Sequence, residues 1–275
     1  MDAGSQAKNI LDRIVEARRA SVEHRKRVLP EVALKIAVEK KAPPPRDFPG
    51  ALSRCGINII AELKRASPSL GVIREDYEPA RLAQALQQAG AAALSVLTEE
   101  DFFQGSLAHL KEASKATEIP ILRKDFIVDP WQVWEARAAG ADSFLLIVAA
   151  LTDAALGELL ELGRQLKMEA LVEVHSRAEL TRALAAGARV IGVNNRDLRD
   201  FKVRLETSIE LVEEIPDACI AISESGLHAH EDLAKLRHAG FDAFLIGEQL
   251  LKRADPAAAL RELLAPATTA AEHSG

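Results

Sequence analysis

Short apolar runs rich in β-branched residues recur along the chain between residues 58 and 246. Each run is followed by a turn and a stretch rich in alanine and leucine, a rhythm typical of a parallel sheet with helical crossovers. The pattern predicts these strands: Asn58–Leu63, Ala92–Leu97, Ile119–Arg123, Asp142–Val148, Ala170–Val174, Arg189–Val193, Cys219–Ser223 and Asp242–Ile246. Eight near-equal units favour an α/β fold of the closed (β/α)₈ type, a TIM barrel, over an open doubly wound sheet. The dinucleotide-binding pattern G-x-G-x-x-G is also missing.

Four of the predicted helix-to-strand junctions contain a glycine between small or apolar residues. A glycine at this position fits the left-handed cap that ends a helix before the chain turns into a strand. The junction glycines are Gly90, Gly140, Gly187 and Gly240.

A helical pattern precedes the first strand and predicts an amphipathic N-terminal helix from Asn9 to Val28. Its apolar stripe consists of Ile10, Leu11, Ile14, Ala17 and Val22. Acidic residues alternate with its basic ones, so we expect the basic residues to form a solvated face. These are Arg13, Arg18, Arg19, Arg25, Lys26 and Arg27. Three prolines at 43–45 then break the chain, which suggests a helical extension (1–48), a barrel (49–264) and a flexible tail (265–275).

The composition is that of an ordinary globular protein, with 48% hydrophobic residues in 275. The net charge of -6 argues against a nucleic-acid binder, which usually has a basic face. No apolar run reaches the roughly 20 residues that span a bilayer, and Met1–Asn9 lacks the apolar part of a signal peptide. We therefore expect a cytoplasmic protein that binds neither nucleic acid nor membrane.

Cysteine and histidine spacing does not match a metal site. Cys55 and Cys219 each lie beside an apolar segment, so we expect two buried free thiols in a reducing compartment. His228 and His230 fall at a predicted helix start and are interpreted as surface residues. We expect no metal.

Polar residues collect at the predicted strand ends, where barrels of this type carry their active sites. Glu62 and Lys64 are two residues apart, so they share one face of a strand, where their opposite charges must be paired or used. Glu173 lies between two valines and has few solvating neighbours. Other polar residues at these ends are Thr98, Glu99, Lys124, Asp125, Asn194, Asn195, Arg196, Glu224 and Ser225. Convergent titratable groups predict general acid–base chemistry.

The loops after the last two strands carry a second signal. Ser225-Gly226 and Gly247-Glu248 each lead from a strand through glycine into a helix start. Barrels commonly bind phosphate there through backbone N–H groups, and Arg196 on the neighbouring loop can add charge-assisted hydrogen bonds. The sequence therefore predicts a phosphorylated substrate.

The segment IIAELKRASPS at residues 59–69 closely resembles the signature of the indole-3-glycerol phosphate synthase family. The resemblance covers nearly the whole chain in order and spacing, including the helical extension. It continues through residues 94–98, 122–127, 172–174, 192–198, 223–226 and 244–247. It implies ring closure of 1-(2-carboxyphenylamino)-1-deoxyribulose 5-phosphate, with loss of carbon dioxide and water, in tryptophan biosynthesis.

The resemblance also implies roles for individual residues. Lys124 is expected to be the general acid at the ketone oxygen, and Glu173 the general base or the stabiliser of a cationic intermediate. Lys64, partnered by Glu62, is expected to reach the substrate carboxylate or the departing hydroxyl. The remaining catalytic residues, which orient these groups, are Asn194 and Glu224.

The same resemblance implies a phosphate site, an aromatic wall and no cofactor. The expected phosphate ligands are Ser67, Arg196, Ser225, Gly226 and Gly247, with Glu248 beside them; the expected wall residues are Pro68 and Phe126. Two departures affect these expectations: Leu70 replaces a lysine of many members, and Glu248 replaces a serine of some.

Other functions remain open from the residues alone. Phosphoribosylanthranilate isomerase and other phosphate-binding barrels share the fold but lack the Glu-x-Lys-x-x-Ser-Pro run. A class I aldolase would use Lys124 as a Schiff base, and a non-catalytic pathway subunit would need no such strand-end charges. We expect a monomer that binds a small phosphorylated aromatic substrate, with at most transient contacts with other tryptophan-pathway enzymes.

Overall fold

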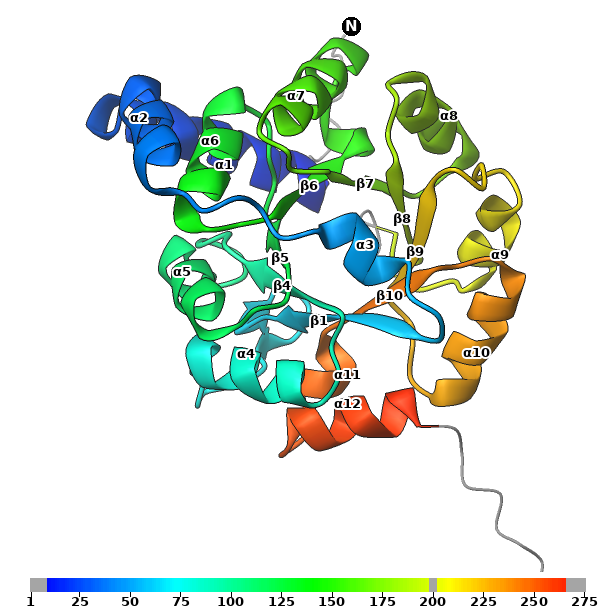
Figure 1. The fold of residues 1–275 in the computed structure, drawn as a ribbon. Helices are drawn as coiled ribbons and strands as arrows, with labels where there is room; N and C mark the ends of the chain where they lie inside the picture. Colours follow the sequence, from blue (N-terminus) through cyan, green and yellow to red (C-terminus); the bar gives the residue numbers. More distant parts are fainter. Residues whose placement is uncertain (1–8, 198–201, 266–275) are drawn as a thin grey trace, which may run out of the picture.

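The computed structural model describes residues 9–197 and 202–265. Within these ranges, eight parallel strands form a closed barrel in the order β1-β10-β9-β8-β7-β6-β5-β4 (Figure 1). The strands are β1 (Asn58–Leu63), β4 (Ala93–Leu97), β5 (Ile121–Lys124), β6 (Ser143–Ile147), β7 (Leu171–Val174), β8 (Val190–Asn194), β9 (Ile220–Glu224) and β10 (Ala243–Ile246). The first strand pairs with both β4 and β10, which closes the barrel and confirms the predicted TIM barrel.

Helices surround the barrel and connect its strands. The outer helices are α4 (Pro79–Gln88), α5 (Leu107–Ala116), α6 (Pro130–Ala139), α7 (Asp153–Gln165), α8 (Arg177–Ala185), α9 (Glu206–Val212), α10 (His230–Ala239) and α12 (Pro256–Leu264). Short elements occupy three loops: the hairpin β2 (Ala66–Ser67) and β3 (Gly71–Val72), the 3₁₀ turn η1 (Val148–Ala150) and the helix α11 (Glu248–Leu251).

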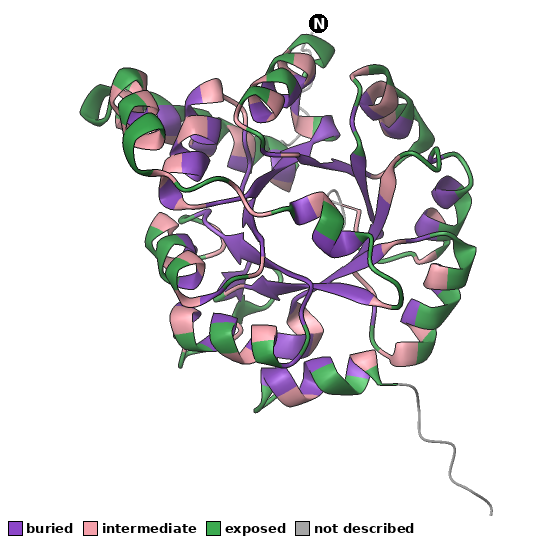
Figure 2. Ribbon diagram, in the orientation of Figure 1, coloured by how far each residue is buried: buried purple, intermediate pink, exposed green. Residues whose placement is uncertain are grey.

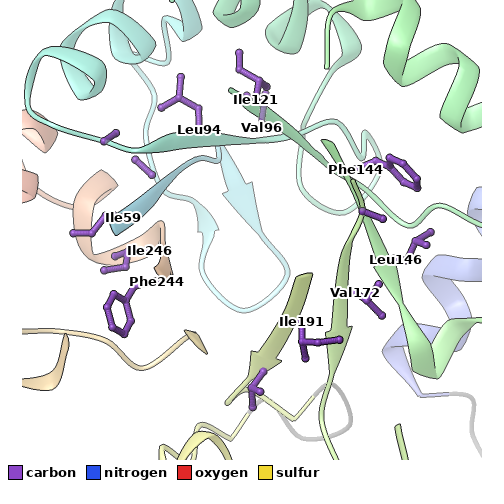
Figure 3. Packing of buried hydrophobic residues seen from close by; sticks show 14 of the residues in the cluster. Ile59, Leu94, Val96, Ile121, Phe144, Leu146, Val172, Ile191, Phe244 and Ile246 are labelled. Atoms are coloured by element: carbon purple, nitrogen blue, oxygen red, sulfur yellow. The ribbon is translucent and has the colours of Figure 1, made fainter. Parts of the chain in front are cut away.

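Strand side chains that point away from the barrel axis pack against the helices (Figure 3). Ile59, Leu94 and Val172 belong to this layer and are fully buried. Figure 2 shows buried strands inside a ring of helices that are exposed on their outer sides. Burial on both faces explains why the strands read as continuous apolar runs rather than as alternating patterns.

The four junction glycines adopt the predicted left-handed conformation. Their φ angles are 103° at Gly90, 93° at Gly140, 82° at Gly187 and 119° at Gly240. At Gly140 the backbone N–H donates to the last turn of α6, as expected for a helix that ends in such a cap.

A short helix, α3 (Phe48–Leu52), covers the N-terminal end of the barrel (Figure 1). Phe48 and Leu52 are fully buried and pack in one cluster with Ile60 and Ala243. The Asn58 side chain fixes this cap by donating to the carbonyl of Leu52. Because α3 closes the base, the opposite end of the barrel is left for a site.

The extension forms two helices, α1 (Ile10–Val28) and α2 (Glu31–Lys41), beside α6 (Figure 1). Leu11 and Ile14 of the predicted stripe are buried in a cluster that includes Phe126 and Ile147, near the C-terminal strand ends. The extension therefore packs against the end of the barrel that α3 leaves uncovered.

The expectation of a solvated basic face on α1 is wrong for Arg18. Its side chain is only 2% exposed because its guanidinium pairs with the buried carboxylate of Asp125. Arg25 and Lys26 are partly buried and pair with Glu135 and Asp129, so the basic residues fasten the extension to the barrel.

Several strands begin one or two residues later than predicted. Asp142 and Asp242 lie just before their strands. Each accepts a hydrogen bond from a backbone N–H near the start of the preceding strand, at Ile121, the first residue of β5, and at Ala221, the second residue of β9. Their polar side chains make them caps rather than strand residues.

Both cysteines are free, but burial was predicted wrongly for Cys55, which is exposed between α3 and β1. Cys219 is half-buried. His228 is exposed as expected, whereas His230 is half-buried and its ring lies 3.0 Å from the Leu263 carbonyl. Leu198 and the tail residues 266–275 lie outside the described residues. In the described part of the chain, no helix is long and apolar enough to cross a membrane.

Candidate active site

A cavity of about 330 Å³ opens at the C-terminal ends of the strands. All the site residues predicted from the sequence line it, although they come from distant parts of the chain. They are Glu62, Lys64, Ser67, Pro68, Lys124, Phe126, Glu173, Asn194, Arg196, Glu224, Ser225, Gly226, Gly247 and Glu248. The barrel thus brings strand-end residues from distant parts of the sequence into one cavity.

Lys124, the last residue of β5, lies between two carboxylates. Its Nζ donates to Glu173 Oε2 at 2.8 Å and to Glu224 Oε2 at 2.9 Å. Each carboxylate side chain is 2% exposed, and that of Lys124 is 14% exposed. Strand position accounts for this cluster, since Lys124 and Glu224 are the last residues of β5 and β9 and Glu173 is the second-last residue of β7.

Burial and charge act in opposite directions on these three groups. Burial disfavours the ammonium of Lys124, but Glu173, Glu224 and Glu62 raise its pKa well above the ordinary value. Burial likewise opposes ionisation of Glu173, yet mainly the Lys124 charge lowers its pKa to about 2. For Glu224 burial prevails, helped by the negative charge of Glu173, and the pKa rises to about 7. The pKa values of these two neighbouring carboxyls are therefore shifted in opposite directions, an arrangement typical of acid–base sites.

A second ion pair lies at the end of β1. Lys64 Nζ is 2.7 Å from Glu62 Oε1, which confirms that the two side chains share a face. A Cβ atom at Gly247 would lie 2.3 Å from Glu62 Oε1, and one at Gly192 would lie 2.2 Å from Glu224 Oε1. Both glycines therefore provide the space that these carboxylates occupy.

The loop after β9 is held in an unusual conformation. Ser225 has a φ of 67°, in the left-handed region that non-glycine residues rarely adopt, and Gly226 follows with 78°. Ser225 Oγ donates to Asn194 Oδ1 at 2.9 Å, and the Asn195 amide donates to the Glu224 and Ser225 carbonyls. These bonds hold the loop in place, and strain of this kind tends to gather at functional sites.

The other side of the cavity is apolar. Leu97, Leu145 and Ile147 line it together with the rings of Phe103 and Phe126, whose centroids are 6.1 Å apart. Such a wall suits an aromatic ring. Phe103 was missed from the sequence because it lies six residues beyond a strand end, in a loop whose position depends on Glu99.

Three polar strand-end residues hold the surrounding structure: Thr98 and Glu99, which do not line the cavity, and Asp125, which does. Glu99 accepts hydrogen bonds from the backbone N–H groups of Asp101, Phe102 and Phe103, and so positions the aromatic loop. Thr98 donates to Asp125 Oδ2, and this buried Asp125 also binds Arg18 and Arg123. These cations, with hydrogen bonds from Arg18 and Thr98, outweigh burial and lower the Asp125 pKa to about 2.

Cationic side chains gather beside the loops after β8 and β10. Arg196 lies 3.5 Å from Glu248 Oε2, and Lys252 pairs with Glu248 Oε1 at 2.6 Å. Lys252, one turn along from Glu248, lines the cavity but was not predicted. Ser67 ends β2 and Pro68 follows it in the turn of the hairpin, where Leu70 is 43% exposed. Sequence reasoning also missed His175, directly after β7.

A TIM barrel with paired acid–base side chains, a cationic edge and an apolar wall at its C-terminal end defines an enzyme of acid–base chemistry on small anionic substrates. Solved structures share the fold at low identity. They include a 3-hexulose-6-phosphate synthase, with TM-score 0.61, 16% identity and coverage of 75% of this chain and 97% of that one. Thiamine phosphate pyrophosphorylase from Pyrococcus furiosus matches with TM-score 0.57, 17% identity and coverage of 77% and 95%.

The chain belongs to the indole-3-glycerol phosphate synthase family, whose family model matches residues 11–263. A relative of that name from Acidithiobacillus ferrooxidans is 48% identical over 93% of this chain and 98% of its own length. Another, from Chloroherpeton thalassium, is 50% identical over 88% and 94%. The chain is thus a carboxy-lyase of tryptophan biosynthesis, which closes the indole ring of indole-3-glycerol phosphate and releases carbon dioxide and water.

Proposed function

We propose that Lys124 is the general acid of ring closure and that Glu173 is its partner base. The observation that carries this proposal is the position of Lys124 Nζ between Glu173 and Glu224 inside the cavity. The flanking carboxylates keep the lysine protonated, and a substrate ketone that enters the cavity would compete for its N–H groups. General acids must lie within hydrogen-bond reach of the atom they protonate.

The proposed reaction closes the ring and then loses first carbon dioxide and afterwards water. The aryl carbon that bears the carboxylate attacks the ketone carbon, while Lys124 transfers a proton to the ketone oxygen. Carbon dioxide then leaves, and the electrons of its bond restore the aromatic ring. The new hydroxyl departs as water after protonation, and Glu173 removes the proton whose loss completes the indole double bond.

Lys64 has a supporting role in this proposal. Its Nζ lies 2.7 Å from Glu62, so it is held as an ammonium at the edge of the cavity. It would bind the substrate carboxylate and then assist the departing hydroxyl. Asn194 and Glu224 would orient the reacting groups, since Asn194 fixes Ser225 and Glu224 fixes Lys124.

Replacement of Lys124 tests the assignment. We expect Lys124→Ala to lower kcat by about 10²–10⁴-fold, the contribution typical of a general acid. The fold and the affinity for inorganic phosphate should stay close to wild type. Lys111→Ala removes an exposed lysine of α5 and should keep full activity. A Lys124→Ala rate above about a tenth of wild type would exclude the role.

We also propose that the loops after β8, β9 and β10 bind the substrate phosphate. The supporting features are Arg196, the left-handed Ser225–Gly226 pair and the Gly247 backbone at the start of α11. Ser67 would reach the phosphate from the hairpin. Arg196 and Lys252 would have to turn from Glu248 to the phosphate. Inorganic phosphate or sulfate should then inhibit competitively, and Gly226→Pro should raise KM strongly. Unchanged substrate affinity in a folded Gly226→Pro protein would contradict this placement.

The chain is further proposed to act as a monomer in the cytoplasm. The cavity is lined by all the predicted site residues without a contribution from a second copy, and the two free cysteines suit a reducing compartment. Light scattering on the eluate of a sizing column should give the mass of one chain. A stable dimer would contradict the proposal, and the exposed Val28, Val32 and Ile36 would then be the first surface to mutate.

A further inference from the structure

His175 directly follows β7 and lies between two carboxylates. Its Nδ1 is 3.3 Å from Glu179 Oε2, and its backbone N–H donates to the same oxygen at 2.8 Å. On the other side, Nε2 lies 3.4 Å from Glu173 Oε1 and has no aligned hydrogen bond. The side chain is 14% exposed and does not line the cavity. The ring therefore reaches the reaction only through Glu173.

The two contacts select the charged form of the ring. A bond to Glu179 needs a proton on Nδ1, and a neutral ring would then turn the lone pair of Nε2 toward the negative Glu173. An imidazolium carries a proton on both nitrogens, so its positive charge faces both carboxylates. Burial lowers the pKa of His175, but the bond to Glu179 and the charges of Glu173, Glu179 and Glu224 raise it above the ordinary value.

The charged groups that face this ring come from several elements. Glu173 belongs to β7, Glu179 to α8 and Glu224 to β9, while the cation Lys124 of β5 reaches Glu173 from the opposite side. The two oxygens of Glu173 thus face two different cations, Oε2 facing Lys124 and Oε1 facing His175. This division matters once Lys124 becomes neutral.

We propose that His175 is a positioning residue whose imidazolium orients Glu173 and keeps it ionised while Lys124 is deprotonated. The inference rests on the proposed acid role of Lys124. When Lys124 gives its proton to the substrate, Glu173 loses the charge that most favours its carboxylate form. His175 then supplies the remaining cation, so Glu173 stays available as a base for the later proton.

The proposal predicts that kcat falls as the pH rises through the pKa of His175, and this fall is the limb of the pH profile tested below. The imidazolium is present below the pKa of His175 in the folded protein and is lost as the pH rises through it. The kcat of the wild type should therefore fall across that pKa. Below that pKa, His175→Asn should lower kcat about tenfold, the effect of a charge interaction worth about one pKa unit, and should leave KM nearly unchanged. It should also remove the fall in kcat at higher pH.

Two further variants sharpen the test. Glu179→Gln keeps the size of the side chain but removes a carboxylate that raises the pKa of His175, so the limb should move to lower pH. His238→Asn makes the same replacement as His175→Asn on the exposed side of α10 and should leave the profile unchanged. A profile of His175→Asn that matches wild type in height and shape would overturn the proposal, as would a change confined to KM.

A titration by NMR separates this inference from the acid role of Lys124. The ring signals of His175, assigned from their absence in His175→Asn, should titrate at lower pH in Glu173→Gln than in wild type. That shift does not depend on turnover. If Lys124→Ala were active while the shift was present, the acid role would fail and the His175–Glu173 coupling would stand. If Lys124→Ala were inactive and the shift were absent, only the His175 inference would fail.

Discussion

At the scale of single residues, the site depends on charges that are buried beside opposite charges. Burying any one of these charges alone would cost a large desolvation free energy, and pairing with an opposite charge offsets that cost. Lys124, Glu173 and Glu224 form one such group, and Arg18, Asp125 and Arg123 form another around Asp125, the residue that follows β5. The second group fixes the backbone on either side of Asp125, which carries Lys124 and Phe126. The ion pairs of Asp125 therefore support the position of the proposed general acid.

Glu224 makes stability depend on pH in a direction that can be tested. Its pKa rises from 4.5 to about 7 on folding, so the folded state binds this proton more tightly than the unfolded state does. The contribution of Glu224 to stability is therefore lost as the pH rises from about 4.5 through 7. Glu224→Gln cannot ionise, so its melting temperature relative to wild type should be higher at pH 8 than at pH 5.

Thermal melts followed by circular dichroism at the two pH values would measure this difference. Glu210→Gln, an exposed glutamate of α9, provides the matched control and should show no such trend. A relative melting temperature for Glu224→Gln that fell between pH 5 and pH 8 would show that Lys124 outweighs burial at this carboxyl.

The sequence predicted residues that line the cavity because strand ends can be recognised from their apolar runs. Glu173, Lys124 and Glu224 each lie within one residue of the end of such a run, and the barrel topology brings these strand ends close together. Phe103 and Lys252 follow no such rule, since one lies in a loop and the other on a helix turn. Arg18 was misjudged because its partner, Asp125, lies 107 positions away in the chain.

At the scale of elements, α1 is fastened to the strand that carries Lys124. Arg18 donates to Asp125 and to the Thr98 carbonyl, while Leu11 and Ile14 pack in the cluster of Phe126 and Ile147. Helical periodicity predicted this helix, but it could not show that a basic residue would enter the core. The sequence pattern alone does not reveal which partner a charge will find.

Arg18→Met should therefore destabilise the fold and disturb the site together. It leaves Asp125 with Arg123 as its remaining cation, and removal of one partner from a buried ion pair costs about 3 kcal/mol. We expect a lower melting temperature and a higher KM. Arg19→Met, on the exposed side of the same helix, should change neither. Wild-type stability and KM in Arg18→Met would mean that the buried pair does not support the site.

Deletion of residues 1–47 extends this test to the whole extension. The barrel and its basal cap α3 remain, but the contacts of α1 with the catalytic end are lost, as is the pairing of Arg46 with Asp142. We expect a folded protein by circular dichroism, with much weaker substrate binding and turnover. Full activity would make the extension a solvated appendage, and a complete loss of helical signal would make it part of the folding core.

At the scale of the whole molecule, the apolar cap and the charged cavity lie at opposite ends of the barrel. α3 closes the N-terminal end with apolar side chains, and the charged residues of the site occupy the C-terminal end. The regular spacing of apolar runs predicted this architecture, because eight near-equal strand–helix units favour a closed barrel over an open sheet. Exact strand limits were less predictable, since the side chains of Asp142 and Asp242 bind the backbone of the adjacent strand instead of continuing their own.

The central claim is that this cavity forms indole-3-glycerol phosphate through Lys124. The most direct measurement supplies purified wild-type protein and Lys124→Ala with 1-(2-carboxyphenylamino)-1-deoxyribulose 5-phosphate and follows indole fluorescence together with carbon dioxide release. We predict one carbon dioxide per indole formed by the wild type, and almost no product from a folded Lys124→Ala protein that still binds the substrate. Wild-type rates of product formation in Lys124→Ala, or no indole from the wild-type protein, would contradict the account.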